Sequence, residues 1–181
     1  MRRIIVVLVL CLGMMALWAQ GESAIVDTAQ LEARNFQVHQ EQGYVVGYKV
    51  VETDLEVYMS APTTGWLAVG FNPSRQMKDA NIIIAYVRNA EPTIRDDFGT
   101  SLTAHSSDLS QGGVDNVTLL DYAEEEGRTS FHFRIPLDSG TPGDRPLVLG
   151  NTYPAIWAFG PNNRDDFLTP HIRRGGFQLK L

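Results

Sequence analysis

Cysteine is almost absent from this chain of 181 residues, and its scarcity excludes several kinds of chemistry. The single cysteine, Cys11, lies in an apolar run at the N-terminus that we expect to be removed. The rest of the chain can then form no disulfide, offer no thiolate to a metal and attach no c-type haem through a C-x-x-C-H motif. Any metal or cofactor has to be held by other side chains.

Long hydrophobic runs are also scarce. The only one, residues 4–18, follows two arginines; it is short for a membrane span but typical of the core of a signal peptide. We therefore expect residues 1–19 to be a cleaved signal peptide. Residues 20–181 are expected to form a single domain, exported to the periplasm or secreted, with no membrane span after cleavage. A retained N-terminal anchor is the alternative.

Positive charge is in deficit. The chain has 15 Lys and Arg against 21 Asp and Glu, a formal net charge of −6. Loss of Arg2 and Arg3 with the signal peptide leaves 13 basic against 21 acidic residues, a net charge of −8. This excess argues against nucleic acid or an anionic membrane surface as the partner. It favours docking on a basic patch of another protein.

Segments with a helical period are missing, apart from one or two turns expected in residues 26–33. Alternating or continuous apolar patterns instead predict β-strands, with Gly- and Pro-rich turns between them. The expected strands are residues 36–39, 44–51, 55–60, 66–71, 82–87, 117–122, 130–135, 152–158 and 177–181. Many short strands at regular spacing indicate an all-β fold, an immunoglobulin-like antiparallel β-sandwich of about nine or more strands.

Motifs of the common catalytic classes are absent too. The sequence has no G-x-S-x-G, no H-E-x-x-H and no glycine loop for phosphate. The pairs Asp96-Asp97 and Asp165-Asp166 are interpreted as solvated turn residues, with a glycosidase-type carboxylate pair as the alternative. We therefore expect an electron carrier or binding module rather than an enzyme.

What the sequence does contain is a methionine in an unusual place. Met77 lies in the segment NPSRQMKDAN, residues 72–81, although a thioether usually fills a gap in an apolar core. His171 also has a distinctive setting, because a proline precedes it and two arginines and two glycines follow within five residues. A thioether and an imidazole are the axial pair of six-coordinate haem in electron-transfer cytochromes. The other histidines are expected at the surface: His39, His105 and His132.

A haem also needs an apolar slot and cations for its propionates. The aromatic residues available for such a slot are Trp66, Phe71, Tyr86 and Trp157. Arg173 and Arg174 are suited to pairing with the propionate carboxylates. Residue types and spacing alone leave this interpretation open beside the simpler one, in which these residues belong to ordinary loops and core.

Three segments of the sequence resemble the DOMON domain family. In order, they are Thr64–Phe71 with Met77–Val87, Phe131–Leu137, and Ile156–Gly160 with His171–Gly175. They resemble that family's G-W-apolar-G-F strand and loop methionine, its aromatic strand ending in an arginine turn, and its final strands. The resemblance extends from about Val26 to Leu181. One departure is Asn81, where the family usually has an aspartate.

The resemblance implies a β-sandwich that binds haem b or, in some members, a sugar. Its haem-binding members include the cytochrome domain of cellobiose dehydrogenase, in which a methionine and a histidine ligate the iron. Carried over by motif, these ligands are Met77 and His171, and the cofactor is non-covalent haem b. We expect no flavin, copper or transmembrane cytochrome domain to be fused to this domain, and therefore a separate redox partner protein or small molecule.

Two alternatives remain open at this point. One is a haem-free carbohydrate-binding DOMON module, in which Trp66 and Trp157 stack on a sugar ring. The other is a structural or interaction domain of the cell envelope, which would bind neither haem nor sugar.

Overall fold

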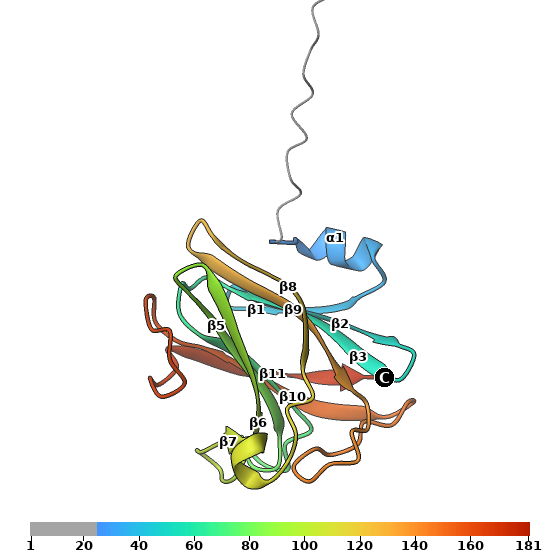
Figure 1. Cartoon of the computed structure of the whole chain (residues 1–181). Coiled ribbons are helices and arrows are strands. Elements are labelled where there is room, and N and C mark those ends of the chain that lie inside the picture. Colours follow the sequence, from blue (N-terminus) through green and yellow to red (C-terminus); the bar gives the residue numbers. More distant parts are fainter. Residues whose placement is uncertain (1–24) are drawn as a thin grey trace, which may run out of the picture.

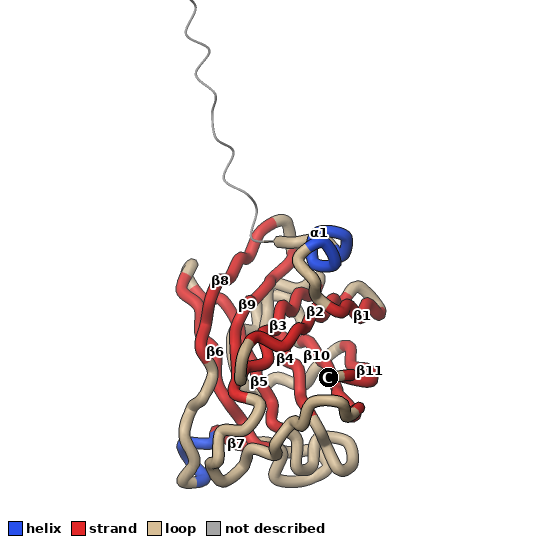
Figure 2. Tube along the Cα trace, turned by 90° about the vertical axis from the view of Figure 1, so that its right-hand side faces the viewer, coloured by secondary structure: helices blue, strands red, loops and turns tan. Residues whose placement is uncertain are grey.

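The structure is a computed structural model that describes residues 25–181, so the expected signal peptide, residues 1–19, lies outside it. The described part consists mostly of β-strands (Figures 1 and 2). Its elements are α1 (Thr28–Ala33), β1 (Gln37–Glu41), β2 (Tyr44–Val51), β3 (Asp54–Ala61), β4 (Leu67–Phe71), β5 (Asn81–Arg88), β6 (Glu91–Phe98), β7 (Ser106–Ser107), the 3-10 helix η1 (Asp108–Gln111), β8 (Thr118–Glu125), β9 (Arg128–Pro136), β10 (Thr152–Phe159) and β11 (Arg173–Lys180). Within residues 25–181 no helix is long and apolar enough to cross a membrane.

Two antiparallel sheets pack face to face, which confirms the predicted β-sandwich (Figure 1). The first has five strands in the order β1-β2-β3-β9-β8. The second has six strands in the order β11-β10-β4-β5-β6-β7. Neighbouring strands pair antiparallel throughout both sheets.

The main core lies between the sheets and follows from the alternating apolar pattern. In β3 the inward residues are Leu55, Val57 and Met59, and β9 places Phe133 and Phe131 beside the last two. From the other sheet, the same cluster takes Leu67, Val69, Phe71, Ile83, Ala85 and Trp157 among others. Burial of each large apolar side chain contributes about 1.5–3 kcal/mol, so this layer is the main source of stability.

Part of the outer face of the five-stranded sheet, over β1 and β2, is covered by α1. Asp27 caps this helix, because its carboxylate accepts a hydrogen bond from Gln30 N at 2.8 Å while the Gln30 side chain accepts one from Asp27 N at 3.0 Å. The helix buries Leu31 against Phe36 and Tyr58 of the sheet region below it. A short amphipathic helix therefore packs on this face, in the part of the sequence where a short helix was predicted.

The outer face of the six-stranded sheet carries a second apolar cluster but no helix. Its buried members are Trp66, Ala68, Ala80, Ile82 and Ile84, with Met77, Tyr86, Ala158 and Phe167 packed against them. Loops gather at the end of the sandwich near β7, as Figure 2 shows. The pairing of an apolar sheet face with loops, rather than with a helix, leaves room for a cavity.

The expectation that Asp96 and Asp97 are solvated turn residues is wrong. They lie in β6, a strand that the sequence did not predict, and are 1% and 0% exposed. The segment EPTIRDDF lacks an apolar alternation, yet it pairs with β5 along its whole length. Main-chain pairing with a strongly apolar neighbour is sufficient to form this strand, and tertiary contacts then bury its carboxylates. The other pair, Asp165-Asp166, does lie in a loop.

Candidate functional site

A cavity of about 430 Å³ lies on the outer face of the six-stranded sheet, over β4, β5 and β10. The sheet forms its floor, and the loops 72–80, 99–105 and 160–172 supply its walls. No residue lining this cavity has a carboxylate, and Arg174 is its only cation. The site is therefore mostly apolar, with a positive charge at one place on its wall.

The floor is kept flat by Gly70. Strand pairing places Ile82 and Ile156 on either side of this glycine. A Cβ at position 70 would lie 2.9 Å from Ile156 Cγ1 and 3.1 Å from Ile82 Cγ1. Ala68 lies on the same face of β4, because strand residues two apart share a face. A planar apolar group could lie against this surface.

Trp66 forms one wall and fixes the loop above it. Its Nε1 donates a hydrogen bond to Thr169 O at 2.9 Å, and its backbone N donates to Arg164 O at 3.2 Å. Its carbonyl accepts from Gly160 N at 2.8 Å, and a side chain at Gly160 would overlap the indole. The loop 160–172 is thereby tied to the start of β4 at several points.

Met77 reaches the cavity from a tightly folded turn. Gln76 and Asp79 adopt positive φ angles of 52° and 64°, and Ala80 N donates to Met77 O at 3.1 Å. Asp79 N donates to Gly99 O at 2.8 Å, and any side chain at Gly99 would overlap the Met77 carbonyl. The polar residues of this segment therefore build a turn that presents one thioether to an apolar space.

His171 lies in the loop that leads from β10 to β11. After it, the chain returns to the sheet where Ile172 N donates to Phe159 O at 2.9 Å. Before it, Asp166 Oδ1 accepts from Thr169 N at 2.6 Å, and this hydrogen bond lowers the pKa of the Asp166 carboxyl. Among residues 25–181, neither His171 nor Met77 has a hydrogen-bond partner for its side chain. Both are thus available to a ligand.

His105 is a second imidazole on the cavity wall, and the sequence had suggested only a surface role for it. Its Nδ1 contacts Oδ2 of Asp97, whose Oδ1 accepts from Arg95 Nε at 2.5 Å. Burial alone would raise the pKa of Asp97, but hydrogen bonds from His105 and Arg95 outweigh it and hold that pKa below its usual range. No local pattern could reveal His105, because its anchor lies on the unpredicted strand β6.

Of the eight sequence-predicted site residues, the structure brings the side chains of four to this cavity, namely Trp66, Met77, His171 and Arg174. Trp157 borders the cavity, but its side chain is 1% exposed and stacks on Tyr44 in the main core, with ring centroids 4.9 Å apart. Phe71 is not among the lining residues; it points into the main core, since β4 alternates and Gly70 takes the outer face. Tyr86 packs beside Phe167 with ring centroids 4.9 Å apart, next to the cavity but outside its lining. Arg173 also lies outside the lining, and its guanidinium donates to the carbonyl of the preceding residue at 3.0 Å.

The chemistry of this lining suits binding rather than catalysis. A thioether and two imidazoles are ligands for iron and other transition metals, and no nucleophile is paired with a base. An apolar floor with a single cation on the wall suits a flat apolar ligand that has an anionic edge. The residues present therefore fit a haem, and they also leave room for another ring-shaped ligand.

Comparison with known sequences identifies relatives for most of this region. The sequence model of the DOMON domain matches residues 40–160, a range that includes Met77 and ends before His171. The DOMON domain-containing protein FRRS1L of Mus musculus is 27% identical over 124 residues, and that of Homo sapiens is 26% identical over 124 residues. Each alignment covers 65% of this chain and 39% of the relative, so the chain spans well under half the length of these relatives.

Solved structures show the same fold at lower sequence identity. The cytochrome b domain of pyranose dehydrogenase from Coprinopsis cinerea superposes with a TM-score of 0.60 at 16% identity, covering 80% of both chains. The cytochrome domain of Myriococcum thermophilum cellobiose dehydrogenase gives a TM-score of 0.58 at 12% identity, covering 81% of both. At such identities the likeness concerns the fold.

Proposed function

The chain belongs to the DOMON domain family, and on that basis we propose that it binds haem b non-covalently in the cavity and carries single electrons. The observation that carries this proposal is that Met77 and His171, far apart in sequence, line one apolar cavity. The solved domains that share its fold include cytochrome domains, which are electron-transfer or binding modules rather than catalytic ones. Their fold supports the proposal, and the ligands are assigned from this chain's own residues.

The residues that would hold the iron are Met77, through its sulfur, and His171, through an imidazole nitrogen. Each side chain comes from a different loop, and neither has a hydrogen-bond partner within residues 25–181. His105 is the other imidazole, but its Nδ1 is already engaged by Asp97. We assign it to the wall, where the buried carboxylate keeps its ring in one orientation.

When bound, a haem supplies one-electron chemistry at its iron, and a thioether ligand raises the reduction potential relative to a second imidazole. The chain's residues then have three tasks. Ala68, Gly70 and Ile82 present an apolar floor that excludes water from the ring. Arg174 offers a cation to a propionate carboxylate. Met77 and His171 would hold the iron from two loops, and with both bound the iron would be closed to oxygen or substrate.

We further propose that the domain works outside the cytoplasm and exchanges electrons with a separate protein or small molecule. The apolar run of residues 4–18, with the features of a signal peptide, supports export. The net charge of −6, and −8 after loss of Arg2 and Arg3, supports docking on a basic surface of the partner.

The visible absorption spectrum of the protein, expressed with a supply of haem, tests this function. We expect a sharp Soret band, and resolved α and β bands after reduction with dithionite. Met77→Ala should retain haem but let the reduced protein bind carbon monoxide, whereas His171→Ala should lose most of its haem. A Met77→Ala spectrum identical to the wild type would refute the ligand assignment.

His105→Gln provides a matched control on the same wall. Glutamine keeps a hydrogen-bond donor for Asp97 but removes the imidazole, so the wild-type spectrum should persist. If His105→Gln instead lost the low-spin spectrum while His171→Ala kept it, His105 would be the iron ligand and the assignment to His171 would be wrong.

The competing function is a haem-free carbohydrate-binding module. The specific observation in its favour is that Trp66 and Phe167 line the cavity, since aromatic faces stack on sugar rings. In that case the protein would be colourless, and no Soret band would develop on titration with haemin. Quenching of tryptophan fluorescence in a carbohydrate screen would then identify the ligand.

A further inference from the structure

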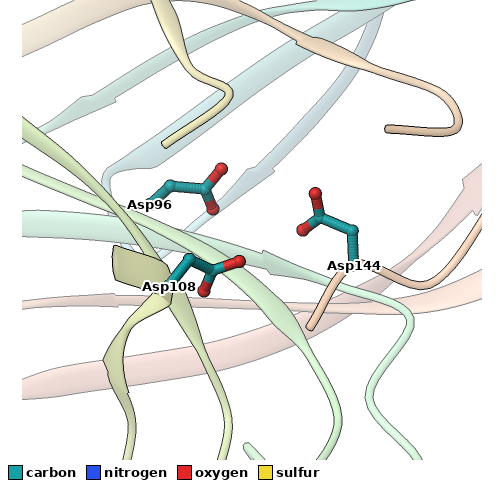
Figure 3. A group of neighbouring side chains, drawn as sticks. All are labelled: Asp96, Asp108 and Asp144. Atoms are coloured by element: carbon teal, nitrogen blue, oxygen red, sulfur yellow. The ribbon is translucent and has the colours of Figure 1, made fainter. Parts of the chain in front are cut away.

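Three aspartates from separate segments converge next to β6, outside the cavity (Figure 3). Asp96 comes from β6, Asp108 begins η1, and Asp144 lies in the loop between β9 and β10. One carboxylate oxygen of each lies within 4.8 Å of the others. Figure 3 shows the three carboxyl groups turned toward a common space.

Two of these carboxylates are deeply buried, and three of their four oxygens lack a hydrogen-bond partner. Asp96 and Asp108 are each 1% exposed, and Oδ1 of Asp96 and both oxygens of Asp108 have no hydrogen-bond partner. None of the salt bridges found within residues 25–181 involves Asp96, Asp108 or Asp144. Burial, reinforced by the neighbouring carboxylates, raises the pKa of Asp96 to about 8 and that of Asp108 to about 6. Unpaired buried carboxylates are costly, so this arrangement calls for a cation.

Neutral donors hold the cluster in place without cancelling its charge. Asp144 Oδ1 accepts from Asn81 Nδ2 at 2.7 Å, and its Oδ2 accepts from Ser139 Oγ at 2.5 Å and from Asn116 Nδ2 at 3.0 Å. The backbone N of Asn116 donates to Asp96 Oδ2 at 3.2 Å. Oδ1 of Asn81, whose amide nitrogen bonds to Asp144, is also buried without a partner.

The neighbouring loop is shaped to approach Asp108. Gly143 has a φ of +103°, a conformation that other residues rarely adopt. A Cβ at this position would lie 3.0 Å from Asp108 Oδ2. The glycine therefore lets the chain turn beside the carboxylate and bring Asp144 to it.

We propose that Asp96, Asp108 and Asp144 bind a calcium ion. All the available donors are oxygens, the choice of a hard cation. Calcium takes oxygens at about 2.3–2.6 Å, so ligands on opposite sides of it are about 4.6–5.2 Å apart. The three carboxylate oxygens lie within 4.8 Å of one another, close enough for one ion of this kind to contact all of them. Magnesium, which binds at about 2.0–2.1 Å and keeps its water, fits a site enclosed by protein less well.

The ion would join three segments that are separate in the sequence. It ties η1 and the loop holding Asp144 to β6, and the next residue of β6, Asp97, anchors His105 on the cavity wall. Its role is thus to stabilise this end of the sandwich. This inference stands whether the cavity binds haem or a sugar.

Thermal unfolding of the full chain, prepared in a chelator and then supplied with calcium, tests the proposal. Millimolar calcium should raise the Tm by about 5 °C, since an ion that binds only the folded state adds its binding free energy to stability. Magnesium at the same concentration should raise it less. Terbium luminescence, displaced by calcium, gives a second readout on the unmodified chain.

The Asp108→Asn variant distinguishes the loss of an ion ligand from the removal of an unfavourable buried carboxylate. Without calcium it should melt above the wild type, because a neutral amide costs less to bury than a carboxylate whose two oxygens lack hydrogen-bond partners. With calcium it should melt below the wild type, because it lacks a ligand. Asp121→Asn, which removes an exposed charge on β8, should respond to calcium as the wild type does.

Two results would overturn the proposal. The first is a wild-type Tm and terbium signal that do not respond to calcium. The second is an Asp108→Asn variant whose calcium response equals that of the wild type. If Asp108→Asn does not fold, Asp144→Asn at the less buried position serves in its place. Its Tm should likewise lie above that of the wild type without calcium and below it with calcium.

Discussion

Asp96 and Asp97 are neighbours on one strand, equally buried, and they belong to two regions of opposite character. Asp97 shares a face of β6 with Arg95 and contacts both Arg95 and His105, so its charge is balanced by the protein itself. Asp96 faces Asp108 and Asp144, and its charge is reinforced by theirs. Consecutive strand residues point to opposite faces, and this alternation separates the two environments.

The difference shows how one strand can serve two sites. On the outer face, a fully paired carboxylate fixes a histidine on the wall of an apolar cavity. On the other side, carboxylates without cations form a candidate ion site. The charge of Asp97 is neutralised within the protein because Arg95 and His105 contact it. Among residues 25–181, Asp96 has no such cation beside it, so its carboxylate is available to a bound ion.

The largest expected effect comes from exchanging each aspartate for its neutral analogue. Asp97→Asn should lower the free energy of unfolding by about 3 kcal/mol, because it breaks a buried ion pair and leaves Arg95 without its partner. Asp96→Asn, measured in chelator at pH 7, should raise the Tm instead, because a neutral amide replaces a carboxyl group whose burial and acidic neighbours raise its pKa to about 8 at a cost in stability. Differential scanning calorimetry of the two variants makes the comparison. Equal destabilisation by both would show that the two environments do not differ.

A smaller effect is expected from filling the cavity floor. Gly70→Ala places a methyl group against Ile156 and should cost about 1–2 kcal/mol of haemin binding, close to a tenfold loss of affinity. The second change Ile156→Val should recover part of this loss by making room. Haemin titrations followed at the Soret band measure both. Wild-type affinity in Gly70→Ala would exclude the floor as the contact surface.

The smallest expected effect is a coupling between the two regions through β6. Calcium should tighten haemin binding by about fivefold, since coupling free energies between linked sites start near 1 kcal/mol and this link runs through a single strand. The titration is repeated with calcium and with chelator, and Asp108→Asn should remove the difference. A calcium effect that persists in Asp108→Asn would place its origin elsewhere.

Much of the fold could be predicted from the sequence. The alternating segments that became β3 and β9, the apolar runs of β4 and β5, and the short helix near residues 26–33 all appear in the structure. Strand β6 could not be predicted from the sequence, because its residues are mostly polar and only the pairing with β5 makes them a strand. The period of apolar side chains predicts a strand where one face of that strand packs in the core. It does not predict a strand such as β6, which is held by main-chain hydrogen bonds to its neighbour.

The candidate cavity was predicted in part. Met77, His171 and Trp66 could be named in advance because a motif resemblance linked their segments. Phe71 could not be placed correctly, since one step along β4 changes the face on which a side chain lies. His105 was missed because its importance depends on Asp97, whose burial no local pattern reveals.

The sequence by itself determined the class of this protein: a β-sandwich whose strands follow from alternating apolar residues, with little cysteine and an excess of acid. Those features are local or additive, so they can be read along the chain. Only the tertiary structure decided which polar residues became buried, and with which partners. Asp144 meets Asp96 and Asp108 because strands from both sheets bring their loops to one place. An aspartate has no special property in the sequence. It becomes part of a candidate ion site only when segments distant in sequence bury it beside other carboxylates.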